Sequence, residues 1–333
     1  MKILIAGLGS IGQRHACNLR LLLGDDLELT AYRVRRTSPV INPDLTVDKS
    51  RDVEEAYGVR AFDDLDPALA DGPDAVFVTN PNVCHIPVAL AAARAGCHVF
   101  VEKPLSHDLE GIDELAELVE AKRLVCLVGY QLRFHPAFHR LRGLLADGAL
   151  GSLISVRLDV GEHLPDMHRY EDYRGLNYGR RDQGGGVILM QAHDLDIAYA
   201  LFGLPRRVFA LGGKRSSLEI DVEDTVAMLL DCAPVPVQVS QDFVRRPPVR
   251  RYELVGEQAT AVWDHVRGTL ELDGETLVEH ADRNALFVEE ARHFLACVAG
   301  HETPAVGVRD AAASLRIALA AKRSIESGSP VTP

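Results

Sequence analysis

A glycine-rich hexapeptide near the N-terminus constrains the fold of this chain most. The apolar run 3–6 (ILIA) leads directly into residues 7–12 (GLGSIG), and a helical pattern follows over 13–23. In the order strand, GxGxxG, helix, the glycines permit a tight turn, close approach of a pyrophosphate to the backbone, and close helix packing. The helix N-terminus adds free N–H groups for the phosphates. The segment therefore predicts a dinucleotide-binding unit whose coenzyme contacts are Gly7, Leu8, Gly9, Ser10, Ile11 and Gly12.

An alternation of strand and helix patterns continues to about residue 128. Further apolar strand patterns occupy 27–32, 59–62, 75–78, 99–101 and 124–128, and helical patterns separate most of them. Residues 39–50, which contain Pro and Asn, predict a loop. Strands that alternate with helices are typical of an α/β fold with a doubly wound parallel sheet. The length of 333 residues predicts roughly two domains.

The second strand pattern bears on the choice of coenzyme. An NAD site usually places Asp or Glu at the end of this strand, where the carboxylate binds the ribose hydroxyls. Here Tyr32 is followed by Arg33, Val34, Arg35 and Arg36. Arginines at this position would hold a 2′-phosphate by charge-assisted hydrogen bonds. We therefore expect Arg33 to contact the coenzyme and NADP to be preferred over NAD. The alternative is that these arginines are solvated and either coenzyme binds.

Polar residues follow two later strand patterns, at the sheet edge where ligands bind in open α/β sheets. The pattern 75–78 leads into Thr79, Asn80, Pro81 and, at the start of a helix, His85. The pattern 99–101 ends in Glu102-Lys103-Pro104, where proline takes the chain out of the sheet. We expect the coenzyme to be contacted by Thr79, Asn80, Pro81, His85, Glu102 and Lys103. The alternatives are a solvated Lys103 and a His85 with no ligand role.

Composition excludes some classes of function. The formal net charge of −12 argues against a nucleic-acid surface, which would carry a basic stripe, and favours a small-molecule ligand. None of the six cysteines forms a CxxC pair, so we expect buried reduced thiols and a cytoplasmic protein. We see no signal-peptide pattern and no apolar run long enough to cross a membrane. No His or Cys spacing predicts a metal site.

Several segments together resemble the Gfo/Idh/MocA family, which includes glucose–fructose oxidoreductase and inositol dehydrogenases. They are 7–12, 79–85 (TNPNVCH), 95–106 (AGCHVFVEKPLS), 129–136 (GYQLRFHP), 184–189 (GGGVIL) and 193–196 (HDLD). The resemblance implies a Rossmann domain over 1–128 and an α+β domain over 129–333. This second domain would carry an open, mostly antiparallel sheet, through which family members associate as dimers or tetramers. It also implies a cis peptide bond between Lys103 and Pro104.

The resemblance further implies a reaction. Family members move hydride between a nicotinamide and a hydroxyl-bearing carbon of a sugar, nucleotide sugar or cyclitol. A proton must leave or join the oxygen as the hydride moves, which calls for an acid–base group such as histidine. By resemblance Lys103 and His193 are catalytic, and Asp196 either orients the imidazole or packs its helix. The expected substrate contacts are Lys103, Arg133, Tyr173, Arg174, Gln191 and His193.

One position departs from the family pattern. Members often carry an aspartate three or four residues before the histidine, where this chain has Leu189 and Met190. Methionine cannot accept a proton, so Lys103 and His193 would have to suffice. We expect a working oxidoreductase. The alternatives are a non-catalytic dinucleotide-binding regulator on the same scaffold and a glycoside hydrolase that recycles NAD.

Overall fold

A computed structural model describes residues 1–34, 39–42, 46–279 and 282–333. The chain divides into two compact units. The first holds Met1–Gln131 and Arg283–Ala312, and the second holds Leu132–Asp282 and Ala313–Pro333. The sequence predicted that all residues after 128 belong to the second domain, whereas residues 283–312 belong to the first unit. They join the first unit because helix α10 (Arg283–Val298) packs against α1 (Ser10–Leu23).

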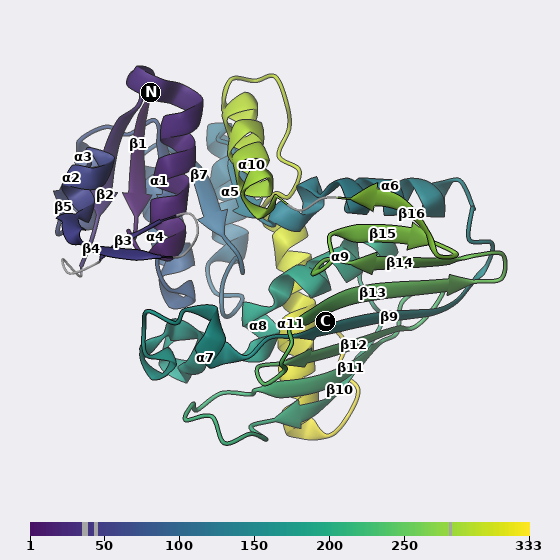
Figure 1. Cartoon of the computed structure of the whole chain (residues 1–333). Coiled ribbons are helices and arrows are strands. Elements are labelled where there is room, and N and C mark those ends of the chain that lie inside the picture. The colour runs from purple at the N-terminus through teal and green to yellow at the C-terminus, as the bar shows by residue number, and fades with distance from the viewer. Residues whose placement is uncertain (35–38, 43–45, 280–281) are drawn as a thin grey trace. The chain divides into compact units, whose positions relative to one another are not determined.

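The first unit is built on a six-stranded parallel sheet of order β5-β2-β1-β6-β7-β8, which confirms the Rossmann prediction (Figure 1). Its strands are β1 (Lys2–Ala6), β2 (Glu28–Tyr32), β5 (Arg60–Phe62), β6 (Ala75–Val78), β7 (His98–Glu102) and β8 (Cys126–Gly129). Besides α1 and α10, its helices are α2 (Val53–Tyr57), α3 (Leu65–Ala70), α4 (His85–Arg94) and α5 (Ile112–Lys122). Two short 3₁₀ turns, η1 (Gly24–Asp26) and η2 (Asn82–Cys84), lie in its loops. Strands covered on both faces are apolar throughout, as β6 is.

An aromatic cluster lies at the centre of the first unit. The rings of Phe77 on β6 and Phe100 on β7 stack with centroids 4.6 Å apart. Phe294 on α10 meets both rings edge-on, at 5.2 and 5.8 Å. Such pairs contribute about 0.5–1.5 kcal/mol each beyond the burial of their area. The cluster is what attaches α10, distant in sequence, to the sheet.

The prediction of a loop over residues 39–50 is wrong in part. β3 (Pro39–Ile41) and β4 (Val47–Asp52) pair as a two-stranded antiparallel sheet. A side chain on α1 holds β3, since Gln13 accepts a hydrogen bond from the N–H of Ile41 at 2.7 Å. Its amide nitrogen donates to the carbonyls of Leu8 and Pro39 at 3.1 and 3.0 Å. Gln13 thus connects the glycine-rich loop to this small sheet.

The second unit is built on an eight-stranded sheet of order β10-β11-β12-β9-β13-β14-β15-β16. Neighbouring strands are antiparallel except β12 and β9, which confirms the mostly antiparallel prediction. The strands are β9 (Leu153–Gly161), β10 (Val208–Gly213), β11 (Thr225–Leu230), β12 (Val237–Asp242), β13 (Val249–Gly256), β14 (Thr260–Asp264), β15 (Thr269–Leu272) and β16 (Glu275–Glu279).

Helices accompany one face of this sheet. They are α6 (Pro136–Ala146), α8 (Val187–Met190), α9 (Ala192–Phe202) and the later part of α11 (Val308–Ser327); in Figure 1 α9 and α11 lie behind the sheet. Four 3₁₀ turns, η3 (Gln131–Phe134), η4 (Tyr173–Gly175), η5 (Asn177–Gly179) and η6 (Arg181–Gln183), and the short helix α7 (Leu164–Met167) lie in the loops. The strands alternate accordingly: Val226, Met228 and Leu230 of β11 are buried, whereas Leu229 between them is 49% exposed.

Cysteines and membrane segments can be compared with the sequence predictions. All six thiols are free, and Cys97, Cys126, Cys232 and Cys297 are buried. The expectation of burial is wrong for Cys17, which is exposed because it lies on the outer side of α1. No helix among the described residues is long and apolar enough to cross a bilayer. Nor do the described residues contain a group of three or more His, Cys, Asp or Glu side chains that could hold a metal ion.

Candidate functional site

The glycine-rich loop of the first unit has the geometry that a dinucleotide requires. Gly7 has a φ of +110°, which favours glycine, and its N–H donates to the carbonyl of Tyr32 at 3.0 Å. A Cβ atom on Gly12 would lie 2.0 Å from the carbonyl oxygen of Gly7, so only glycine fits there. Beside Gly9, by contrast, a Cβ atom would meet nothing within 4 Å. This open backbone and the first turn of α1, which no side chain caps, fit a pyrophosphate.

The end of β6 lies against this loop, as the sequence predicts. The hydroxyl of Thr79 donates to the carbonyl of Gly7 at 2.6 Å, and its N–H donates to that of Ala6 at 3.0 Å. A Cβ atom on Gly7 would come within 2.9 Å of the backbone nitrogen of Asn80. The loop and the β6 end therefore form one surface in the first unit, with Pro81 following directly in the chain.

His85 is placed differently from its predicted role as a coenzyme contact. It is buried, and its ring nitrogens lie 2.8 Å from the carbonyl oxygen of Pro104 and 2.9 Å from that of Asn80. Burial lowers the pKa of His85, although both carbonyls oppose this. Since backbone carbonyls occupy both nitrogens, the ring connects the end of β6 to the turn after β7. We therefore interpret it as a support for these two segments.

Glu102 and Lys103 end strand β7. One Glu102 carboxylate oxygen lies 2.7 Å from Nε2 of His15, and the other accepts the N–H of Lys103 at 3.1 Å. The Lys103–Pro104 peptide bond is cis, as the resemblance implied. His15 is fully buried on α1, and the centroid of its ring lies 5.3 Å from that of Phe77 and 4.9 Å from that of Phe100. The sequence analysis missed His15; the signal was a polar residue at a buried position of an amphipathic helix.

Arg33 is buried rather than solvated, with 3% of its surface exposed. Its Nη1 donates to Glu54 at 2.8 Å, and its Nη2 has no hydrogen-bond partner among the described residues. A buried donor without a partner is costly, at about 1–3 kcal/mol. The remaining donor of Arg33 could therefore serve a ligand oxygen. Arg35 and Arg36, the other arginines of the prediction, lie outside the described residues.

In the second unit the run of three glycines is explained by close packing. Gly186 has a φ of +115°, and a Cβ atom there would lie 2.1 Å from the carboxylate of Glu223. On Gly185 a Cβ atom would lie 2.4 Å from the carbonyl of Asn177. The glycines thus let the loop of η4, η5 and η6 pack against the segment that leads into α8.

His193 lies in the first turn of α9 and is 4% exposed. Gln191, just before it, is buried and donates from its amide nitrogen to the carbonyl of Asp242 at 3.1 Å. The backbone carbonyl of Gln191 accepts a hydrogen bond from Gln241 at 2.8 Å. These two bonds fix the start of α9 to strand β12. The amide of Gln191, predicted to bind substrate, is thus at least partly engaged in holding the helix.

Asp194, just after His193, is held by residues of strand β13. Its carboxylate accepts a short hydrogen bond from the hydroxyl of Tyr252, and Arg250 Nε lies 3.1 Å away. Asp194 on α9 and Tyr252 on β13 are buried, and Arg250 on β13 is partly buried. Burial, and then the charge of Asp194, raise the pKa of Tyr252 well above its ordinary value, so the phenol stays a donor. His193 therefore sits between two anchored residues.

Asp196 has contacts that hold its helix, one of the two roles that the sequence left open. Arg133 donates to its two oxygens at 2.6 and 2.9 Å, and the hydroxyl of Ser314 donates at 2.9 Å. Such bidentate charge-assisted pairs are among the stronger polar contacts in proteins. The guanidinium of Arg133, which the sequence predicted to contact substrate, thus also anchors α9 through a buried carboxylate.

Tyr173 and Arg174, both predicted to contact substrate, also have partners. Arg174 is exposed and donates to Asp172 at 2.7 to 3.0 Å and to Glu219 at 2.9 Å. The hydroxyl of Tyr173 accepts the N–H of Glu219 at 3.2 Å. Asp172 beside Arg174 and Glu219 from the segment between β10 and β11 therefore pair with Arg174, and Tyr173 helps to hold the two segments together.

Comparison with known proteins decides the family. Residues 1–130 match the family model "Oxidoreductase family, NAD-binding Rossmann fold", and residues 138–262 match "GFO/IDH/MocA C-terminal domain". The chain belongs to the GFO/IDH/MocA oxidoreductase family. This confirms the resemblance found in the sequence, and with it a nicotinamide-dependent oxidoreductase that acts on CH–OH groups.

Two curated relatives and one solved structure illustrate the similarity. The chain is 29% identical to the myo-inositol 2-dehydrogenase of Thermotoga maritima, over 98% of this chain and 96% of that protein. It is 28% identical to the scyllo-inositol 2-dehydrogenase (NAD(+)) of Bacillus subtilis, over 98% and 94%. The crystal structure of GenD2 from gentamicin A biosynthesis, in complex with NAD, has a TM-score of 0.82 at 23% identity, over 100% and 96%. The last comparison shows a shared fold.

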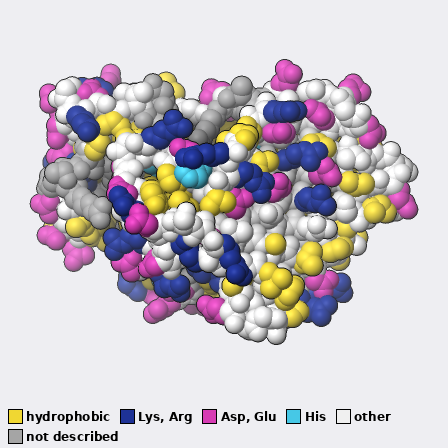
Figure 2. Space-filling model, turned by 60° about the horizontal axis from the view of Figure 1, so that its bottom comes forward, with side chains coloured by type: hydrophobic (Ala, Val, Ile, Leu, Met, Phe, Trp, Pro, Cys, Tyr) yellow, Lys and Arg dark blue, Asp and Glu magenta, His cyan; other side chains and the backbone are white. Residues whose placement is uncertain are grey.

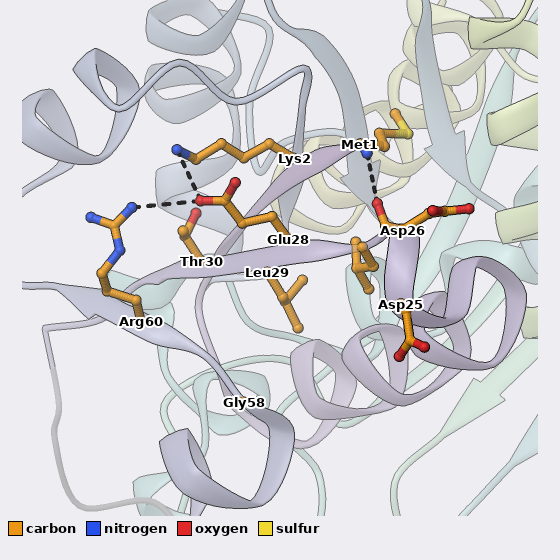
Figure 3. Close-up of a pocket in the computed structure, with 10 residues that line it drawn as sticks. Met1, Lys2, Asp25, Asp26, Glu28, Leu29, Thr30, Gly58 and Arg60 are labelled. Atoms are coloured by element: carbon orange, nitrogen blue, oxygen red, sulfur yellow. Dashed lines mark hydrogen bonds and ion pairs between the residues drawn. The ribbon is translucent and has the colours of Figure 1, made fainter.

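A cavity of about 640 Å³ in this oxidoreductase lies beside the starts of strands β1 and β2 (Figure 3). Met1 and Lys2 at the start of β1, and Glu28 at the start of β2, line it. Ligands of doubly wound sheets bind at the opposite, carboxyl ends of the strands. The ammonium of Lys2 is paired with Glu28 at 3.1 Å. The cavity therefore lies at the end of the sheet opposite to the one where such folds bind their ligands.

Proposed function

We propose that this oxidoreductase interconverts a secondary alcohol and a ketone on a neutral polyhydroxylated ring, a cyclitol or a free sugar. The observation that carries the proposal is the end of strand β7. There Lys103 follows directly on Glu102, in the same unit as the glycine-rich loop and the β6 end. We take Gly7–Gly12, Thr79, Asn80 and Pro81 as coenzyme contacts; the sequence predicted these together with Arg33, His85, Glu102 and Lys103.

The proposed chemistry divides between two residues. A bound nicotinamide dinucleotide supplies the hydride acceptor or donor. The Lys103 ammonium donates a hydrogen bond to the substrate oxygen and stabilises the negative charge that develops there. His193 takes the proton of the hydroxyl in the oxidation direction and returns it in the reverse direction. Met190 cannot take up a proton. In this assignment Lys103 and His193 therefore act without the aspartate that the family often carries before the histidine.

The choice of a neutral substrate rests on the arginines of the second unit. Arg174 is paired with Asp172 and Glu219, and Arg180 with Asp182 at 2.7 Å. Arg181 contacts the segment between β10 and β11, since its Nη2 donates to the carbonyl of Asp221 at 3.0 Å. A diphosphate or carboxylate would need to displace these local contacts. On the face shown in Figure 2, acidic and basic side chains are likewise interspersed.

The proposal is tested by reduction of coenzyme in the presence of candidate alcohols. Purified protein with NAD⁺ or NADP⁺ is mixed with myo-inositol, scyllo-inositol, glucose or UDP-N-acetylglucosamine, and absorbance of the reduced nicotinamide is followed. We expect turnover with a neutral polyol. Turnover with the nucleotide sugar alone would contradict the neutral substrate. Tight NADH binding without any turnover would favour the regulator alternative.

We also propose that NADP is preferred, with Arg33 as the reason. Its unpaired Nη2 would donate to the 2′-phosphate, a charge-assisted bond worth about 1.5–3 kcal/mol, or roughly 10- to 100-fold in affinity. Arg33→Gln is therefore expected to weaken NADPH binding by about tenfold or more and NADH binding far less. Fluorescence titration of both coenzymes measures this. Arg60→Gln, on the exposed β5, is the control for loss of a positive charge.

A tighter affinity of the wild-type protein for NADH would contradict the NADP proposal. The crystal structure of GenD2 is a complex with NAD. The similarity to this structure therefore gives no support to a preference for NADP. In that case Arg33 would be a structural partner of Glu54, which already accepts its Nη1.

We further propose a homo-oligomer formed through the open face of the eight-stranded sheet. Leu211 on β10 and Leu229 on β11 are 60% and 49% exposed there, in adjacent strands. Their neighbours across the sheet include Gln238 and Arg157, so the face mixes apolar and polar side chains. Sedimentation equilibrium measures the number of subunits. A monomer at all concentrations would contradict this proposal.

A further inference from the structure

Glu290 on helix α10 is a buried acid that the proposed mechanism does not use. None of its surface is exposed, and neither carboxylate oxygen has a hydrogen-bond partner among the described residues. An ionised carboxylate in such a place is strongly unfavourable, and the group neutralises instead. The position therefore calls for a neutral carboxyl, and for a reason why an acid is there at all.

The charged neighbour of Glu290 is Glu102. Burial, and then the charge of Glu102, raise the pKa of Glu290 well above its ordinary value. Glu102 in turn lies 2.7 Å from His15 and accepts the N–H of Lys103. Phe287 lies three residues before Glu290 on the same helix, and the centroid of its ring lies 6.3 Å from that of the His15 ring. Helix α10 thus closes over an ionisable cluster at the end of β7.

The other titratable groups on the elements around this cluster have their own partners. On α1, Arg14 donates to Asn284 and lies over the ring of Phe287. On α10, Glu289 pairs with Arg292 at 2.7 Å, and His293 with Glu302. The charge that acts on Glu290 is therefore that of Glu102 on β7, and Glu102 itself contacts His15 on α1.

We propose that Glu290 is a positioning residue: its neutral carboxyl lets Glu102 stay between His15 and the backbone N–H of Lys103. The inference rests on the proposed role of Lys103. A second negative charge beside Glu102 would repel it, and the two contacts of Glu102 hold the end of β7. Ionisation of Glu290 would therefore displace Lys103 and lower turnover, without removing any group that touches the coenzyme or the substrate.

The matched pair of variants is Glu290→Gln and Glu289→Gln. Glutamine keeps the shape of the neutral acid and cannot ionise, whereas Glu289 is an exposed neighbour on the same helix. We expect kcat of the wild type and of E289Q to fall together at alkaline pH. E290Q is expected to keep kcat within about threefold at neutral pH and to lose that decline. An unchanged alkaline decline in E290Q would overturn the proposal, as would a large loss of kcat at neutral pH.

Thermal stability provides a readout that does not depend on activity. For an acid whose pKa is raised by folding, the native state binds more protons than the unfolded state above the unfolded pKa. Stability then falls as pH rises, by about 1.4 kcal/mol per pH unit for one proton, until the folded pKa is passed. The stability of wild type relative to E290Q should therefore decrease from about pH 4.3 upward. A pH-independent difference would overturn the inference.

Infrared spectroscopy separates a failure of this inference from a failure of the proposed function. At about pH 8 exposed carboxyl groups are ionised, and a protonated carboxyl has its own carbonyl stretch. The difference between wild type and E290Q should contain that band, while the difference between wild type and E289Q should lack it. Absence of the band means an ionised Glu290 and overturns the proposal. Wild-type protein that shows the band but turns over no substrate contradicts only the proposed function.

Discussion

Replacement of Lys103 by methionine is expected to lower kcat by about 10²–10³-fold, or roughly 3–4 kcal/mol. Methionine keeps most of the apolar stem and removes the ammonium, so the substrate oxygen loses the donor that stabilises its developing charge. The coenzyme contacts at Gly7–Gly12, Thr79 and Asn80 come from other segments. The dissociation constant of the coenzyme should therefore change by less than about threefold, under 0.7 kcal/mol.

Single-turnover kinetics and a fluorescence titration of the reduced coenzyme separate these two effects. Lys122→Met is the matched control, because Lys122 is an exposed lysine of the same unit that donates to the carbonyl of Arg94. The control should retain wild-type kcat. Full activity of Lys103→Met would show that the end of β7 is not the reacting site. A parallel loss of coenzyme affinity would assign Lys103 to coenzyme binding.

Short-range patterns account for the part of the first unit that the sequence predicted. The strand, glycine-rich loop and α1 are adjacent in the chain, and their chemistry follows from residue type and order. The close approach of Thr79 to Gly7 was also predictable, since the carboxyl ends of neighbouring parallel strands share one edge. Here pattern and tertiary structure agree.

Partners distant in sequence explain what the sequence did not predict. Whether Arg133 binds substrate or anchors a helix depends on Asp196, which is far along the chain and lies within its reach. The same holds for β3, which Gln13 holds in place, and for Glu290, which folding brings to Glu102. In each case the residue type was known from the sequence, but its role depends on which distant residues the fold brings into contact with it.

The open sheet of the second unit was expected only from the family resemblance. Its strand order places β9 in the centre, between β12 and β13. A parallel pair of β12 and β9 inside an otherwise antiparallel sheet cannot be derived from alternation of side chains, because alternation gives the buried face and not the neighbour. The resemblance supplied this long-range information.

Replacement of His193 by asparagine is expected to lower kcat by about 10²–10⁴-fold. Asparagine retains hydrogen-bonding capacity and a similar size but cannot take up the proton of the substrate hydroxyl. The change should stay local, because Gln191 and Asp194 hold the backbone on both sides through β12 and β13. Thermal unfolding should therefore shift little, and coenzyme affinity should be unchanged.

The pH profile gives the decisive measurement for His193. If this imidazole is the base, kcat for alcohol oxidation in wild type falls toward acid pH as the imidazole is protonated, and the residual kcat of His193→Asn lacks that limb. His139→Asn, at an exposed position of α6 in the same unit, should keep both kcat and profile. Retention of the acid limb in His193→Asn would show that another group takes the proton. Because the aspartate usual in the family is replaced here by Leu189 and Met190, that group would have to come from outside the α8–α9 segment.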